Sequence, residues 1–184
     1  MNLPNCLTIG RLLAVPLVVW LIVTGEHLGA FIAFALAGLT DALDGALARA
    51  LDQRTRLGAY LDAVADKGLI AAIYVTLALT GDIPPALVVV VVVRDALIIG
   101  AVLLTRLRGR PIAIDPSRLS KANTFVQIGF AALMLGARGF GWNAPTLEIA
   151  GAWVVGALTL WSAAAYLATF IRHTTLAGAR PTDE

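Results

Sequence analysis

Six long apolar stretches limit what this chain can fold into more than any other feature of its sequence. Each is close to the length of about 20 residues that a helix needs to cross a bilayer. They run over about 7–23, 28–51, 57–80, 84–107, 119–135 and 147–171. Hydrophobic residues make up 59 % of the chain and charged residues 14 %, which excludes an ordinary soluble domain. The sequence therefore predicts an all-α membrane protein with six transmembrane helices, forming a single domain over residues 1–184.

The basic residues lie mostly on one side of this predicted topology. The turns after the second and fourth spans and the C-terminal tail are rich in arginine, whereas the opposite loops hold one basic residue, Arg138. The positive-inside rule then puts both termini in the cytoplasm. We expect a protein of a bacterial inner membrane. The formal net charge of +2 is too small to indicate nucleic-acid binding, and the arginines suit anionic lipid headgroups.

Four aspartates lie in two pairs within this apolar sequence. Asp41 and Asp44 are three residues apart in the second span, and Asp62 and Asp66 are four apart in the third. Each pair therefore shares one face of a helix. Residues 51–56 between the pairs are polar enough to form the turn of a helical hairpin. Counting outward from that turn along antiparallel helices brings the two pairs to the same height, so the four carboxylates are predicted to converge on the cytoplasmic side.

Converging carboxylates need compensating positive charge, because without it they repel one another and partly protonate. Oxygen-only ligands indicate a hard divalent ion such as Mg²⁺, Mn²⁺ or Ca²⁺, and two such ions form a common clamp for phosphoryl transfer. Arg49 can hold a phosphate, and small residues leave room for a ligand: Gly45, Ala46, Ala48, Gly58 and Ala59. The alternative is that the aspartates form structural ion pairs with Arg49, Lys67 and Arg94.

The arrangement of these residues resembles the signature of the CDP-alcohol phosphatidyltransferase family. The match runs Asp41-x-x-Asp44-Gly45-x-x-Ala48-Arg49, then eight residues, then Gly58-x-x-x-Asp62-x-x-x-Asp66. The resemblance implies six transmembrane helices, a homodimer, and displacement of CMP from a CDP-linked substrate by an alcohol. It also implies that Asp41, Asp44 and Asp62 hold two Mg²⁺ or Mn²⁺ ions. Asp66 is then the catalytic base as well as a possible metal ligand.

The N-terminus resembles a second pattern, Asn-x-Pro-Asn-x-x-Thr-x-x-Arg, of the family branch that makes phosphatidylglycerophosphate and cardiolipin. Its Thr8 and Arg11 join four residues of the main signature as candidates for binding CDP-diacylglycerol: Gly45, Ala48, Arg49 and Gly58. Arg11 lies close enough to the predicted cytosolic face to reach a phosphate. Snorkelling of its side chain to lipid headgroups explains this position equally well.

Arg94 lies about 20 Å deep in the fourth span, counted from its cytosolic end. It can bind the phosphate of an acceptor or form a structural ion pair. Asp95 is a candidate partner, although adjacent residues on a helix do not face each other. Both interpretations of Arg94 stay open from the sequence.

The start of the fifth span, Ser120-Lys121-x-Asn123-Thr124-x-x-Gln127, carries a polar helix face that suits a phosphate or glycerol headgroup. Such residues also join transmembrane helices to one another. The pattern resembles eukaryotic-type cardiolipin synthases, whereas phosphatidylglycerophosphate synthases more often have Gly-Lys-x-Lys-Thr here and Arg-Glu at 94–95. The candidate acceptor-binding residues are Arg94, Arg110, Lys121 and Asn123.

These resemblances together imply a cardiolipin synthase, which transfers the phosphatidyl group of CDP-diacylglycerol to a glycerol-based lipid, phosphatidylglycerol. The alternative acceptor is glycerol 3-phosphate, as in a phosphatidylglycerophosphate synthase. A cation or proton transporter also needs carboxylates inside the membrane, but it needs access from both sides, whereas these four lie in the cytosolic half. A catalytically silent scaffold is a further alternative, and unchanged activity after Asp66→Asn would favour it.

Overall fold

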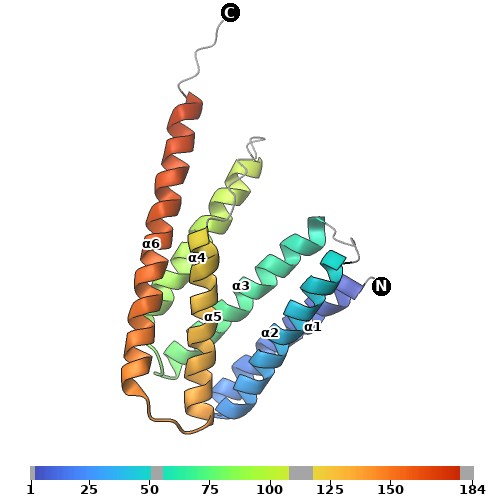
Figure 1. The fold of residues 1–184 in the computed structure, drawn as a ribbon, viewed down its shortest axis with the longest axis vertical. Helices are drawn as coiled ribbons and strands as arrows, with labels where there is room; N and C mark the ends of the chain where they lie inside the picture. The colour runs from blue at the N-terminus through green and yellow to red at the C-terminus, as the bar shows by residue number, and fades with distance from the viewer. Residues whose placement is uncertain (1–2, 51–55, 108–117, 179–184) are drawn as a thin grey trace, which may run out of the picture.

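The computed structural model contains six α-helices and no strand in the residues that it describes, 3–50, 56–107 and 118–178 (Figure 1). Side chains are described for residues 13–40, 42, 67–100 and 119–169. The helices are α1 (Leu3–Val23), α2 (His27–Ala50), α3 (Arg56–Leu79), α4 (Pro85–Leu107), α5 (Arg118–Gly139) and α6 (Pro145–Gly178). Each coincides with one predicted apolar stretch, and most ends agree within four residues, although α6 runs on to Gly178. The predicted all-α class is confirmed.

The loops between α1 and α2, α3 and α4, and α5 and α6 are built in the same way. Each contains a glycine with positive φ in its first two residues: Gly25 (80°), Gly81 (84°) and Gly141 (67°). At the end of α3, the N–H of Gly81 donates to the carbonyl of Ala78 at 3.2 Å. The N–H of Asp82 donates to the carbonyl of Leu77 at 2.8 Å. This pair of bonds is a Schellman motif, which needs a left-handed residue, and glycine adopts that conformation at low steric cost.

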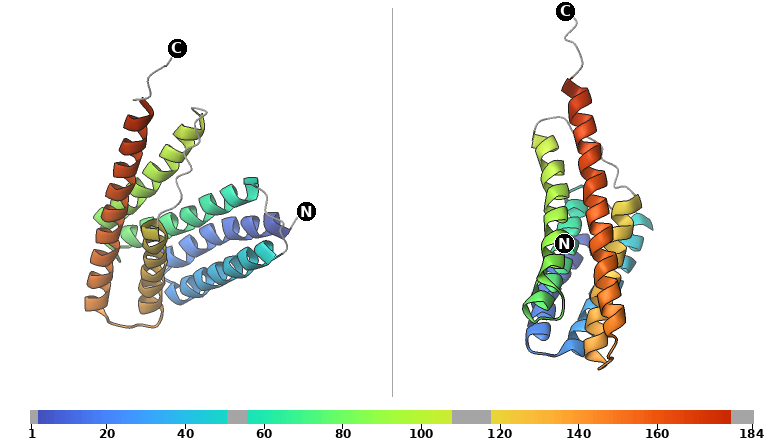
Figure 2. Two further views of the ribbon diagram at one scale, coloured as in Figure 1. Left: turned by 45° about the horizontal axis from the view of Figure 1, so that its top comes forward. Right: turned by 90° about the vertical axis from the view of Figure 1, so that its left-hand side faces the viewer.

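These three loops lie at one end of the bundle, so consecutive helices run in opposite directions (Figure 1). α1 contacts α2 and α3, α2 contacts α5, and α3 contacts α4 and α5. α6 packs against α4 and α5. From the loop end the helices diverge, with α1, α2 and α3 running together at a large angle to α6 (Figure 2). Through its contacts with α1, α4 and α5, α3 connects these parts of the bundle.

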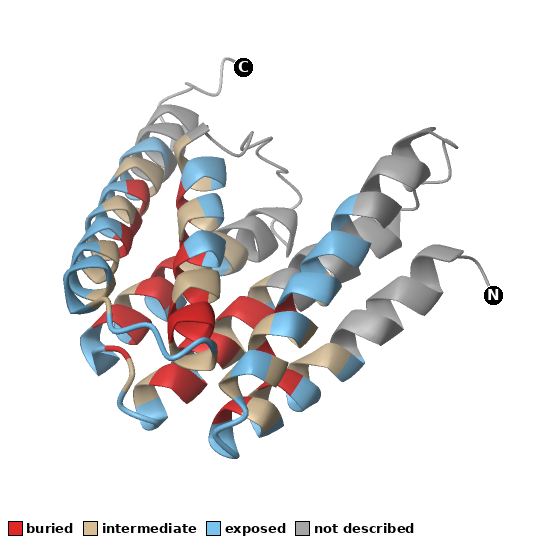
Figure 3. Ribbon diagram, turned by 60° about the horizontal axis from the view of Figure 1, so that its bottom comes forward, coloured by how far each residue is buried: buried red, intermediate tan, exposed pale blue. Residues whose placement is uncertain are grey.

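Buried apolar residues gather where these helices meet (Figure 3). The most deeply buried come from several helices: Val18, Ile22, Ala30, Ile73, Tyr74, Leu77, Val91, Ala131, Met134, Leu135 and Val155. Large apolar side chains also cover the outside of the bundle; Leu79 is 82 % exposed and Phe125 78 % exposed. Apolar residues therefore occupy both the inner and the outer faces of the helices.

One helical segment among the described residues, Pro145–Thr169 of α6, is long and apolar enough to cross a membrane by length and composition. Three shorter apolar helical segments accompany it: Leu13–Val23, His27–Thr40 and Lys67–Leu79. The six-span topology and the cytoplasmic position of both termini stay predictions.

Candidate functional site

The two aspartate pairs lie on consecutive helices that run in opposite directions, as the predicted hairpin requires. Asp41 and Asp44 belong to the C-terminal half of α2, and Asp62 and Asp66 to the N-terminal half of α3. Both pairs lie on the lengths of α2 and α3 that lead away from the three loops described above (Figure 1). The four side chains lie outside the described set, so their convergence stays a prediction.

A set of four carboxylates fits Mg²⁺ or Mn²⁺, because both ions accept oxygen ligands. Among the side chains that the structure describes, no three His, Cys, Asp or Glu residues form a group that could hold a metal ion. Several predicted site residues belong to helices but have side chains outside the described set: Thr8, Arg11, Gly45, Ala48, Arg49 and Gly58. Arg110 falls outside the described residues altogether.

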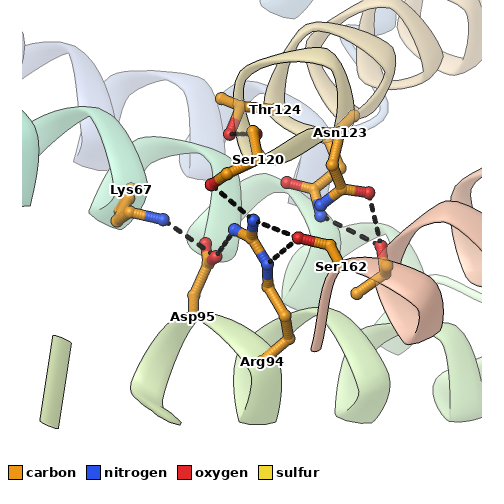
Figure 4. Close-up of polar contacts among 9 residues, drawn as sticks. Lys67, Arg94, Asp95, Ser120, Asn123, Thr124 and Ser162 are labelled. Carbon is orange, nitrogen blue, oxygen red and sulfur yellow. Dashed lines mark hydrogen bonds and ion pairs between the residues drawn. The ribbon is translucent and has the colours of Figure 1, made fainter. Parts of the chain in front are cut away.

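Arg94 of α4 is the centre of a polar cluster that also takes in side chains of α3, α5 and α6 (Figure 4). Its side chain is 1 % exposed. Nε and Nη2 donate to the hydroxyl of Ser162 on α6 at 3.3 and 2.7 Å. Nη2 also donates to the hydroxyl of Ser120 on α5 at 2.7 Å. A buried guanidinium needs such partners, because an unpaired buried charge is costly.

Asp95, which the sequence offered as a candidate partner of Arg94, completes the cluster. The Nη1 atom of Arg94 lies 2.6 Å from Oδ1 of Asp95, although the two residues are neighbours on α4. Adjacent residues on a helix do not face each other, but the guanidinium lies at the end of a long, flexible side chain that can turn back toward its neighbour. The same carboxylate oxygen lies 2.8 Å from Nζ of Lys67 on α3 (Figure 4).

These contacts bear on the two interpretations of Arg94. Donors on all three of its side-chain nitrogens are directed to protein partners in α4, α5 and α6. This arrangement favours a structural ion pair over a free phosphate-binding arginine. The alternative for the four signature aspartates was that they form structural ion pairs with Arg49, Lys67 and Arg94. Two of these three cations, Lys67 and Arg94, have Asp95 as a described counter-ion, which weakens that alternative.

Asn123 and Gln127 form a second buried polar group with Thr159 of α6. The Thr159 hydroxyl donates to Oδ1 of Asn123 at 3.0 Å and accepts from Nε2 of Gln127 at 3.3 Å. The Tyr74 hydroxyl donates to the carbonyl of Gln127 at 3.0 Å, which ties α3 to α5. Nδ2 of Asn123 is buried and has no hydrogen-bond partner among the described residues. These bonds favour the helix-joining interpretation of this face, while Lys121 is exposed in the first turn of α5.

The CDP-alcohol phosphatidyltransferase family model matches residues 1–171, which contain both aspartate pairs and the Arg94 cluster. The chain belongs to this family. The predicted family assignment is thereby confirmed.

Several members of the family are similar to the chain over most of its length. A cardiolipin synthase (CMP-forming) of Homo sapiens is 36 % identical over 181 residues, which cover 90 % of this chain and 60 % of that protein. A probable cardiolipin synthase (CMP-forming) of Drosophila melanogaster is 33 % identical over 192 residues, with coverages of 95 % and 59 %. A chloroplastic CDP-diacylglycerol–glycerol-3-phosphate 3-phosphatidyltransferase of Oryza sativa is 33 % identical over 184 residues, with coverages of 90 % and 56 %. The chain thus spans less than two thirds of the length of these relatives.

The buried polar residues of α6 in this phosphatidyltransferase were missed from the sequence alone. Ser162 and Thr159 of α6 hold Arg94 and Asn123, yet neither residue was among the candidates taken from the sequence. Their spacing of three residues in an otherwise apolar helix was the available signal, because it puts both hydroxyls on one face. The pairing of Lys67 with Asp95 was missed because it joins positions 28 residues apart in the sequence.

Proposed function

We propose that this protein is a cardiolipin synthase that transfers the phosphatidyl group of CDP-diacylglycerol to a hydroxyl of phosphatidylglycerol. The observation that carries the proposal is the family match over residues 1–171 together with the intact aspartate signature on α2 and α3. The names of the human and fly relatives support cardiolipin as the product. The apolar outer surface of the bundle supports a place in the lipid bilayer, because exposed apolar patches of this extent suit a membrane.

In this proposal Asp41, Asp44, Asp62 and Asp66 hold two Mg²⁺ or Mn²⁺ ions. Such ions, when bound, neutralise the negative charge that develops on the transferred phosphoryl group and the departing CMP. Gly45 and Ala48 leave space for the nucleotide. The remaining donor-binding residues contribute side chains or space at the diphosphate: Thr8, Arg11, Arg49 and Gly58.

The chemical step exchanges one phosphorus–oxygen bond for another. The acceptor hydroxyl oxygen forms a bond to the phosphorus of the phosphatidyl group, and the bond from that phosphorus to the oxygen of CMP breaks. Asp66 accepts the proton of the acceptor hydroxyl, as a general base within hydrogen-bond reach can do. The acceptor is oriented by four polar residues: Arg94, Arg110, Lys121 and Asn123. Of these, Arg94 acts through its buried cluster, since its own donors already have protein partners.

The deciding experiment offers purified protein CDP-diacylglycerol with Mn²⁺ or Mg²⁺ and several acceptors in parallel. These are phosphatidylglycerol, glycerol 3-phosphate, serine and inositol phosphate, and mass spectrometry identifies the product. We expect cardiolipin and CMP from the phosphatidylglycerol reaction and no product after chelation of the metal. Product from glycerol 3-phosphate alone would instead establish the phosphatidylglycerophosphate synthase, which the similarity to the rice relative favours. Ion flux without CMP release would support a transporter.

Asp62→Ala tests the site within this assay. We expect the variant to lose about 10³-fold or more in rate with every acceptor, because catalysis of phosphoryl transfer depends mainly on electrostatic stabilisation of the transferred group. Asp82→Ala is the matched control, since Asp82 is an aspartate in the loop between α3 and α4 at the other end of the bundle. Wild-type turnover in Asp62→Ala would contradict the site.

Lys121→Ala tests the acceptor side. Lys121 is exposed in the first turn of α5, where an anionic headgroup can reach it. Losing one charge-assisted hydrogen bond there should raise the acceptor KM about tenfold, equivalent to about 1.4 kcal/mol, with kcat little changed. Steady-state kinetics against phosphatidylglycerol in mixed micelles measure this. An unchanged KM would remove Lys121 from the acceptor site.

We also propose that the protein acts as a homodimer with its site open to the cytoplasm. Cross-linking in native membranes tests the first statement, and labelling of cysteines introduced near each predicted loop tests the second.

A further inference from the structure

The polar cluster at Arg94 joins four helices through the carboxylate of Asp95 and the guanidinium of Arg94. Oδ1 of Asp95 is 2.6 Å from Nη1 of Arg94 and 2.8 Å from Nζ of Lys67. Arg94 in turn is bonded to Ser120 of α5 and Ser162 of α6. A continuous chain of polar contacts therefore runs from α3 through α4 to α5 and α6 (Figure 4).

Lys67 is the member of this cluster that α3 contributes, and it directly follows Asp66. Its side chain is 26 % exposed, and that of Asp95 is 15 % exposed, so the ion pair is largely shielded from water. Partial burial strengthens an ion pair relative to one on the surface, because the surrounding dielectric constant is lower. The pair therefore holds α3 at one rotation about its own axis relative to α4.

The rotation of α3 sets where its acidic side chains point. A carboxylate near the rim of a helix lies about 5–6 Å from the axis, so a rotation of about 10° displaces it by about 1 Å. A displacement of about 1 Å at a catalytic centre can cost about 100-fold in rate. The contact at Lys67 is thus placed to control Asp62 and Asp66 without touching a substrate.

We propose that Lys67 and Asp95 are positioning residues that orient the acidic face of α3 for binding the two metal ions. This inference rests on the proposed function, because it takes Asp62 and Asp66 as metal ligands. It goes further by assigning a role to two residues outside the aspartate signature. Arg94 and its two serine partners fix the far end of the contact, so that Asp95 presents its oxygen to Lys67 from a rigid base.

Two simpler roles for Lys67 predict different effects on metal binding. A positive charge beside a cation site repels the cation, so a purely electrostatic role predicts that removing the charge strengthens metal binding. A role limited to general stability predicts a lower melting temperature with unchanged metal affinity. Positioning alone predicts weaker metal binding from a variant that has lost a positive charge.

Lys67→Met is the principal variant, because it removes the α3 contact while leaving the Arg94–Asp95 pair intact. We expect its Mn²⁺ affinity to fall about 10–100-fold, the usual cost of losing a residue that orients metal ligands. Electron paramagnetic resonance of free Mn²⁺ measures this on the purified full chain without any substrate. Turnover should fall through kcat with little change in the acceptor KM. Lys67→Arg, which keeps a cation of similar reach, should retain most of the affinity.

Asp95→Asn breaks the same contact from the other side and should give the same loss of Mn²⁺ affinity. The matched control is Asp82→Asn, an aspartate of similar exposure, 14 %, that pairs with Arg138 at 2.7 Å near the loop end. It should lower the melting temperature but leave Mn²⁺ affinity at the wild-type value. Wild-type or stronger Mn²⁺ binding by folded Lys67→Met overturns the positioning role.

The experiment also separates this inference from the function on which it rests. If wild-type protein binds Mn²⁺ and Asp62→Ala does not, the metal site stands whatever Lys67→Met does. Wild-type affinity in Lys67→Met then overturns the positioning role alone. If wild-type protein binds no Mn²⁺ at saturating concentrations, both the site and the positioning role are wrong.

Discussion

At the scale of single residues, buried polar side chains are the groups whose loss should be felt most. Arg94, Asn123, Gln127, Thr159 and Ser162 are all buried at 3 % exposure or less. Each of them has at least one described partner on another helix. Inside an apolar bundle these contacts replace the hydrogen bonds that water would otherwise provide, so each one specifies which helix faces which.

Thr159→Val tests the group on α5 and α6. The variant keeps the shape of the side chain but leaves Oδ1 of Asn123 and Nε2 of Gln127 without their described partner. We expect a loss of about 1–2 kcal/mol in stability, measured by unfolding in detergent. Thr169→Val on the same helix is the control, since its exposed hydroxyl donates to a carbonyl of its own helix, that of Ala165, at 2.9 Å. Equal losses in both variants would contradict the assignment.

At the scale of elements, the helices are brought close by residues without side chains. Gly139 ends α5 against the start of α2, where an added Cβ would lie 2.8 Å from Cα of Leu28 and 2.9 Å from its backbone nitrogen. Gly151 of α6 likewise meets the ring of Phe130, with a Cβ at 2.6 Å. Backbone gives way less easily than a side chain, so the α2–α5 contact is the stricter of the two.

Gly139→Ala should therefore push α2 away from α5. We expect a loss of about 1–3 kcal/mol, as for other overpacked sites, seen as a lower melting temperature. Gly129→Ala is the control on the same helix, because nothing lies within 4 Å of its added Cβ. There the change from glycine should raise helix stability by up to about 1 kcal/mol. The opposite signs distinguish close packing from a general intolerance of α5 to substitution.

At the scale of the whole molecule, an ion-pair cluster joins the helices at the end of the bundle that carries the three loops. Nε of Arg138 donates to Oδ1 of Asp82 at 2.7 Å, and its Nη atoms donate to Glu148 at 3.2 Å. Thr80 also donates to Asp82, at 2.6 Å. The cluster joins the end of α5 to the α3–α4 loop and the start of α6. It therefore holds helices together at the end opposite the aspartate signature.

Because of this cluster, we expect the protein to lose stability as the pH becomes acidic. Burial raises the pKa of Asp82, but hydrogen bonds from Thr80 and Arg138 and the charges of Arg138 and His27 outweigh it, so the net pKa is lowered. The unfolded chain then binds the proton more readily, with a pKa of about 3.9. The contribution is therefore present above about pH 4 and is lost as pH falls through the lower folded pKa.

Melting temperatures of wild type and Asp82→Asn between pH 6 and pH 3 test this dependence. The wild type should be the more stable at pH 6, and the difference should shrink as pH approaches 3. A difference that stays constant over this range would show that the charge of Asp82 contributes nothing.

Much of the fold can be predicted from the sequence, because the positions and ends of the helices depend on residues close together in the chain. The length of each apolar stretch predicts a helix, and Gly25, Gly81 and Gly141 lie just past three helix ends. The chemistry of the candidate site follows from spacing as well. Asp41 with Asp44, and Asp62 with Asp66, share helix faces for reasons of helical geometry alone, so the signature identifies the family before any packing is known.

The partners of the buried polar residues could not be derived in this way. Arg94 meets Ser120 and Ser162, which lie 26 and 68 positions away, and Asp95 meets Lys67 on another helix. In an ordinary soluble bundle a polar outer face reveals the rotation of each helix. Here large apolar side chains occupy both the inner and the outer faces, so the hydrophobic pattern leaves helix rotation undetermined. Packing in three dimensions chooses those rotations, and with them the counter-ions of Arg94 and Lys67.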